Sequence, residues 1–225
     1  MQVQTLTLDV GGRSIEAELY VRGGAPRPGV LLLHELFGLN SNVRADARHL
    51  AREGYAVLAP NLYTGGMRRY CMKMFFSTDA LMNRSSAPQV QEVHRCLDFL
   101  KARPECDGRL GMIGMCLTGG FVLQMARRDD MKAPVVFHHG FGVADGGISR
   151  EDAARVRTTI LGHFAERDPM CPRSRVARLE RDLGDKLQAH IYRGVGHGLR
   201  SQFRFTSQSA QAWQRTLDFF AANLR

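Results

Sequence analysis

The chain has 225 residues, of which 44% are hydrophobic, so it can bury one large core and has no need of a second domain. Its formal net charge of +9 would suit a nucleic-acid partner, but the arginines are spread along the chain without a basic stripe interleaved with aromatic residues. We therefore interpret the charge as a solvated basic surface and expect no nucleic-acid partner. The longest purely aliphatic run, 30–33, is too short to cross a bilayer, so no membrane partner is expected either.

The cysteines and the first residues of the chain indicate a cytoplasmic location. Five cysteines are scattered without a C-x-x-C pair, which argues against a disulfide framework or a zinc site. Residues 1–10 alternate polar and apolar side chains, so we expect no signal peptide there.

Strand-like and helix-like segments alternate from end to end. In chain order we predict strands at 4–10, 14–21 and 30–34, a helix at 42–52, a strand at 55–59, an irregular segment with short helices at 61–88, a helix at 88–100, a strand at 110–113, a helix at 117–127, strands at 134–137 and 158–164, a helix at 176–183, a strand at 187–192 and a helix at 210–220. The first two strands flank a Gly-Gly turn and predict a hairpin. The rest predicts an α/β domain spanning 1–225, with a mostly parallel sheet and helices on both faces.

Three motifs follow strand-like runs in the order nucleophile, acid, histidine. Cys116 lies in Gly-Met-Cys-Leu, Asp168 opens an Asp-Pro turn, and His197 lies in Gly-His-Gly. Because the carboxyl ends of parallel strands meet at one edge of a sheet, we expect these side chains to converge. The order is typical of the α/β-hydrolase catalytic layout, in which the histidine takes the proton of the nucleophile and the acid orients the histidine. It predicts acyl transfer to water through a thioester.

A second segment, His-Glu-Leu-Phe-Gly at 34–38, follows the central strand. This place supplies the second oxyanion donor, so we expect the backbone N–H of Leu36 to act with that of Leu117. Glu35 would then be a carboxylate on the floor of the site, close to the thiol. Apolar neighbours argue against the alternative that Glu35 is a solvated loop residue.

Taken together, the His-Glu-x-Phe-Gly segment, the Gly-x-Cys-Leu turn, the Asp-Pro-x-x-Pro turn and the late Gly-His-Gly resemble the dienelactone hydrolase family. The resemblance covers nearly the whole chain and implies an α/β-hydrolase fold without a large lid domain. It also implies a cofactor-free cysteine hydrolase that opens an unsaturated enol-lactone to a keto acid, with Cys116, Asp168, His197 and Glu35 at the site and no metal. In that family the matching glutamate restrains the thiol until substrate binds.

Two differences from the family pattern concern the turn and the substrate. Thr118 stands where the family has glycine, and Gly119-Gly120 is displaced by one position. Family members hold the substrate carboxylate with arginines, which makes Arg200 and Arg69 the candidates here, at altered spacing.

The chemistry of a thiolate favours a small, activated ester or lactone over a peptide, and rim arginines would favour an anionic substrate. The predicted partner is therefore a small molecule, bound by a monomer or weak homodimer. Two alternatives remain: a carboxylesterase or thioesterase of the same fold, and a non-catalytic ligand-binding protein.

Overall fold

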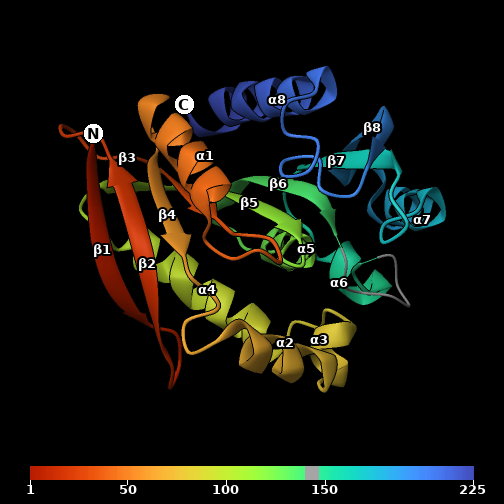
Figure 1. The fold of residues 1–225 in the computed structure, drawn as a ribbon, viewed down its shortest axis with the longest axis horizontal. Coiled ribbons are helices and arrows are strands. Elements are labelled where there is room, and N and C mark those ends of the chain that lie inside the picture. The colour runs from red at the N-terminus through yellow and green to blue at the C-terminus, as the bar shows by residue number, and fades with distance from the viewer. Residues whose placement is uncertain (140–146) are drawn as a thin grey trace.

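The computed structural model describes residues 1–139 and 147–225, and these form one eight-stranded sheet covered by helices on both faces (Figure 1). The strand order is β1-β2-β4-β3-β5-β6-β7-β8. The strands are β1 Gln2–Asp9, β2 Ser14–Val21, β3 Arg27–Leu32, β4 Ala56–Pro60, β5 Cys106–Cys116, β6 Met131–His139, β7 Ile160–Arg167 and β8 Leu187–Gly196. The helices are α1 Ser41–Arg52, α2 Met67–Phe75, α3 Thr78–Leu81, α4 Pro88–Lys101, α5 Gly119–Met125, α6 Arg150–Ala154, α7 Arg173–Leu183 and α8 Ser207–Leu224, with a 3₁₀ turn at Gly184–Lys186.

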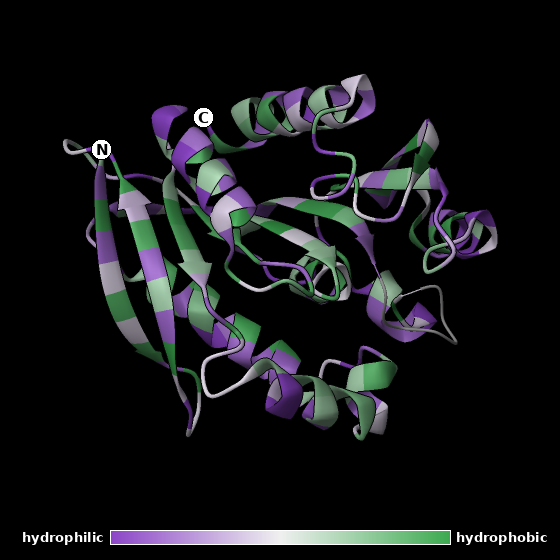
Figure 2. Cartoon of the chain, in the orientation of Figure 1, coloured by the Kyte–Doolittle hydropathy of each residue, from purple (hydrophilic) through white to green (hydrophobic). Residues whose placement is uncertain are grey.

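The predicted parallel sheet with an antiparallel hairpin at its edge is confirmed. β1 pairs antiparallel with β2, and β2 pairs antiparallel with β4, whereas every pair from β4 to β8 is parallel. Hydrophilic and hydrophobic residues alternate along β1 and β2 (Figure 2), because one face of an edge hairpin meets water. β4 is buried along its whole length, as expected of a strand covered on both faces.

Two hydrophobic clusters lie on opposite faces of the sheet. One packs α1 and α8 against the sheet through residues such as Leu50 and Trp213, and the other packs α4, α5 and α7 through residues such as Val93, Phe121 and Leu179. Local signals fix where the helices begin. For example, the Asn40 side chain accepts hydrogen bonds from two backbone N–H groups of the first turn of α1.

The predicted and observed elements differ mainly around the candidate site. The helix predicted from residue 117 begins at Gly119, because residues 116–118 form a tight turn. α2 and α3 occupy the segment expected to hold short helices, and α6 was not predicted. Within the described residues no separate domain covers the carboxyl edge of the sheet, and no helix is both long and apolar enough to span a membrane.

Candidate active site

Cys116 ends the central strand β5 in a strained turn. Its φ of 54° lies in the left-handed region, which costs energy for any residue other than glycine. The strand before it can turn so sharply because Gly114 has no side chain: a Cβ there would lie 2.5 Å from the carbonyl oxygen of Thr118. The turn therefore presents the thiol at the sheet edge, directly before α5.

Gly119, the first glycine after the turn, allows α5 to approach the sheet closely. A Cβ on Gly119 would lie 2.1 Å from the carbonyl oxygen of His138 on β6, a distance that no packing adjustment could relieve. Thr118, which stands at the position of the family glycine, is fully buried, and its hydroxyl accepts the Met115 N–H at 3.0 Å. The same hydroxyl lies 3.1 Å from the carbonyl oxygen of His34, so it connects the turn to the end of β3.

The structure brings Cys116, His197 and Asp168 into one hydrogen-bonded chain. His197 Nε2 lies 2.9 Å from the Cys116 Sγ, and His197 Nδ1 lies 2.9 and 3.0 Å from the two Asp168 oxygens. Asp168 follows β7, His197 follows β8, and Asp168 Oδ1 also accepts the backbone N–H groups of Met170 and Cys171. The carboxylate is thus fixed in place before it orients the imidazole.

The hydrogen bonds along this chain of contacts stabilise the charged forms of His197 and Asp168. Burial by itself would lower the pKa of His197, but hydrogen bonds to Asp168 and Cys116 outweigh it and raise that pKa to about 10. Burial would likewise raise the pKa of Asp168, and the hydrogen bond from His197 instead lowers it below its ordinary value. A protonated His197 donates from Nδ1 to the carboxylate and from Nε2 to the sulfur.

Glu35 lies in the site, as its apolar neighbours predict, and is buried. Burial raises the pKa of its carboxyl group, which the hydrogen bond from Ser201 and the nearby His197 partly offset. The Ser201 hydroxyl donates to Glu35 Oε2 at 3.1 Å. His34, immediately before it, is buried and holds the loop: its Nδ1 lies 2.7 Å from the Glu35 carbonyl oxygen, and its Nε2 accepts the Leu62 N–H at 3.1 Å.

A cavity of about 370 Å³ opens beside the Cys116 thiol, and we call it the Cys116 cavity. Leu36 and Leu117 lie on its wall, and their role as backbone oxyanion donors stays a prediction. The residues that line it are Glu35, Leu36, Phe37, Cys71, Phe75, Leu81, Cys116, Leu117, Met170, His197 and Gln202.

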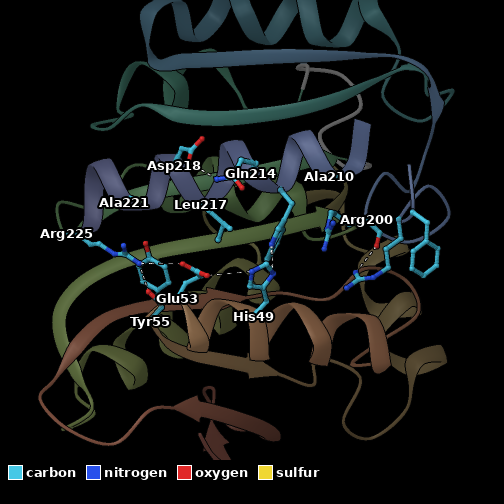
Figure 3. Close-up of a pocket in the computed structure, with 13 residues that line it drawn as sticks. His49, Glu53, Tyr55, Arg200, Ala210, Gln214, Leu217, Asp218, Ala221 and Arg225 are labelled. Carbon is cyan, nitrogen blue, oxygen red and sulfur yellow. Dashed lines mark hydrogen bonds and ion pairs between the residues drawn. The ribbon is translucent and has the colours of Figure 1, made fainter. Parts of the chain in front are cut away.

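Arg200, expected to bind substrate, points away from this cavity. Its side chain is only 8% exposed; the guanidinium pairs with the buried carboxylate of Asp46 and stacks 4.3 Å above the Trp213 ring. It lines a different cavity of about 580 Å³ along α1 and α8, and Figure 3 labels it among the residues around that cavity. The sequence could not indicate this position, because the spacing from His197 says nothing about Asp46, which lies 154 residues before Arg200.

Arg69, the second candidate for substrate binding, also lies outside the Cys116 cavity. It is exposed on α2 and lines a separate cavity of about 310 Å³ beside Arg13 and Glu92. α2 is amphipathic, so the helix face that carries Phe75 toward the thiol turns Arg69 elsewhere.

His138 is a site residue that the sequence did not single out. It is the penultimate residue of β6 and has a φ of 42°, and its buried ring packs 4.2 Å, centre to centre, from the ring of His197. Burial lowers its pKa to about 3, so the ring is neutral, and neither ring nitrogen has a hydrogen-bond partner among the described residues. The signal that could have indicated it is its position directly after the strand predicted at 134–137.

Cys116, His138 and His197 could also hold a metal ion, since one ligand atom from each lies within 4.8 Å of the others.

Comparisons with known proteins agree with this geometry. The profile of the dienelactone hydrolase family matches residues 15–224. The carboxymethylenebutenolidase of Pseudomonas putida is 24% identical over 216 residues, covering 88% of this chain and 86% of its own length. A dienelactone hydrolase-like promiscuous phosphotriesterase from metagenomic libraries superposes with a TM-score of 0.84 at 21% identity, over 100% of this chain and 99% of that one. A cold-adapted esterase from an Arctic intertidal metagenomic library superposes with a TM-score of 0.75 at 17% identity, over 100% and 94%. The fold is the α/β-hydrolase fold.

Proposed function

Because this chain belongs to the dienelactone hydrolase family, we propose that it is a cysteine-dependent hydrolase of small carboxylic esters or lactones. The observation that carries the proposal is the continuous contact from Asp168 through His197 to the Cys116 sulfur, beside a cavity of suitable size. A buried carboxylate–imidazole–thiol chain at the end of a central strand is the arrangement that nucleophilic acyl transfer requires.

In the first half-reaction the proton of the Cys116 thiol passes to His197, and the sulfur attacks the carbonyl carbon of the ester. The resulting oxyanion would face the backbone N–H groups of Leu36 and Leu117. His197 then gives its proton to the departing oxygen, the carbon–oxygen bond breaks, and a thioester remains. In a lactone the departing oxygen stays attached to the same molecule.

In the second half-reaction water enters beside the thioester. His197 removes one proton from that water, the hydroxide attacks the carbonyl carbon, and the carbon–sulfur bond breaks. His197 returns that proton to the departing sulfur, so the products are a carboxylic acid and the restored thiol, and no redox partner is consumed. Asp168 stabilises the imidazolium in both halves and stays ionised throughout.

Two functions fit this chemistry. Opening of a carboxymethylenebutenolide is suggested by the name of the Pseudomonas putida relative. General carboxylesterase or thioesterase activity is favoured by the apolar residues Phe37, Phe75 and Met170 that line the cavity. The ordered contacts at Cys116 speak against a non-catalytic binding protein, because a ligand pocket has no need of them.

Hydrolysis of p-nitrophenyl acetate by matched cysteine variants tests the proposal. We expect Cys116→Ala to abolish hydrolysis with an unchanged circular dichroism spectrum, because the turn depends on backbone and glycines. The control is Cys71→Ala, which removes the second thiol of the same cavity and should retain activity. Activity that survives in purified Cys116→Ala, or is lost in Cys71→Ala instead, would point to another nucleophile.

A further inference from the structure

The described walls of the Cys116 cavity carry no lysine or arginine that could hold a carboxylate. Among the described residues that line it, the ionisable groups are two thiols, one carboxyl and the His197 ring, with no lysine or arginine. The seven residues outside the description, 140–146, contain neither lysine nor arginine in their sequence. A carboxylate that leaves water needs charge-assisted hydrogen bonds, and His197 is already engaged with Asp168 and the sulfur.

The arginines that follow His197 in the sequence are held by another partner. Arg200 and Arg204 both pair with the carboxylate of Asp46, and Arg204 Nη2 lies 2.8 Å from Asp46 Oδ1. Asp46 is 2% exposed, so turning these arginines toward the thiol would strand a buried negative charge. The ion pair therefore keeps both guanidinium groups in the α1–α8 region, away from substrate.

The walls of the Cys116 cavity are apolar and come from separate segments. Phe37 follows β3, Phe75 ends α2, Leu81 ends α3 and Met170 follows β7. Phe37 is 59% exposed and Met170 is 50% exposed, so both present apolar surface at the mouth that a bound substrate could cover. Burying such surface favours a hydrocarbon group and gives nothing to a charged one.

The carboxyl group of Glu35 also disfavours an anionic substrate. Glu35 has its Oε2 bonded to Ser201, and its carboxylate would repel a second anion in this partly enclosed space. We propose that the Cys116 cavity selects esters or lactones whose acyl part is uncharged and apolar and disfavours carboxylated ones. Selection among substrates during hydrolysis rests on the proposed function, whereas the discrimination against negative charge is a property of the cavity itself.

Two p-nitrophenyl esters that differ in one charge test the selection during turnover. The butyrate and the hemisuccinate share a leaving group and nearly the same length, and we expect kcat/KM to be at least about tenfold higher for the butyrate. From acetate to butyrate kcat/KM should rise about fourfold for each methylene that becomes buried. Equal or faster hydrolysis of the hemisuccinate by the unmodified protein would overturn the proposal.

A matched pair of variants ties the selection to this cavity. Met170→Arg places a cation at the mouth and should reduce the butyrate-to-hemisuccinate ratio by at least about fivefold. Phe76→Arg adds the same charge next to Phe75, at a side chain that is 81% exposed and does not line the cavity, so the ratio should stay near that of the unmodified protein. Identical ratios for the two variants would contradict the proposed site of selection.

Alkylation separates this inference from the proposed function, because it needs no turnover. Neutral iodoacetamide and anionic iodoacetate are compared for their rates at Cys116, measured by peptide mapping and divided by their rates with free cysteine. We expect the normalised rate to favour iodoacetamide. That result without ester hydrolysis would refute the hydrolase and support the charge selection, whereas a normalised preference for iodoacetate would overturn the selection.

Discussion

Thr118→Val removes one buried hydroxyl from the turn that carries Cys116 and keeps the shape of the side chain. In the structure this hydroxyl accepts the Met115 N–H at 3.0 Å and lies 3.1 Å from the His34 carbonyl oxygen. Leaving a buried polar group without its partner costs about 1–3 kcal/mol, so two such groups predict a loss of about 2–6 kcal/mol in the free energy of unfolding. A domain in the upper part of the ordinary range of stability, about 5–15 kcal/mol, still folds after that loss.

The variant should also lose activity, because the hydroxyl joins the Cys116 turn to the end of β3, where Glu35 and Leu36 follow. A displacement near 1 Å at a reacting group costs about a hundredfold in rate, so we expect kcat/KM to fall about ten- to a hundredfold. Urea unfolding measures the stability, and p-nitrophenyl acetate hydrolysis measures the rate.

Thr216→Val is the matched control for this prediction. Thr216 is a residue of α8 and is also fully buried. Its hydroxyl lies 3.1 Å from His163 Nε2 and 3.0 Å from the Ala212 carbonyl oxygen. It should lose a similar free energy of unfolding and keep its kcat/KM. A Thr118→Val protein within about 0.5 kcal/mol of the unmodified chain would refute the reasoning, as would equal losses of kcat/KM in both variants.

Three other substitutions test the electrostatics of the site. Cys116→Ser should leave only weak hydrolysis, measured against Cys116→Ala, because a hydroxyl is far harder to deprotonate than a thiol. Glu35→Gln should speed iodoacetamide alkylation of Cys116 about two- to fivefold at neutral pH, since a negative charge in the cavity disfavours the thiolate; the surface variant Glu166→Gln is the control, and equal rates would exclude the contact. In Asp168→Asn the pH dependence of stability should flatten. The pKa of His197 is raised to about 10 in the folded protein, so its contribution to the free energy of unfolding is complete below pH 6.5 and is lost as pH rises through about 10. Urea unfolding from pH 6 to 9.5 measures this, and the same change of unfolding free energy with pH in the unmodified protein and in Asp168→Asn would contradict it.

The sequence was most informative where backbone geometry alone decides the outcome. Cys116 ends a strand and Asp168 and His197 each follow one, and parallel strands bring their carboxyl ends together whatever the side chains around them. The order of elements followed in the same way from hydrophobic periodicity. The turn at Cys116 was recognisable from its glycines, because a close approach of helix and strand excludes a Cβ.

Side-chain direction was not predictable, because it depends on partners far away in the sequence. The orientation of Arg200 is set by Asp46 and Trp213, which lie on two different helices. The ring contact between His138 and His197 depends on the left-handed backbone at His138, which no periodicity indicates for a histidine. The bond from Ser201 to Glu35 joins two loops whose approach only the assembled sheet determines.

The segment that contains α2 and α3 contributes Cys71, Phe75 and Leu81 to the wall of the Cys116 cavity but supplies none of the three groups in the Asp168–His197–Cys116 chain. Part of the cavity wall and the three proposed catalytic groups therefore come from different stretches of polypeptide. Natural variation, or a laboratory exchange of 61–88 between relatives, can reshape the first while leaving the second untouched, which gives one scaffold a route to many substrates.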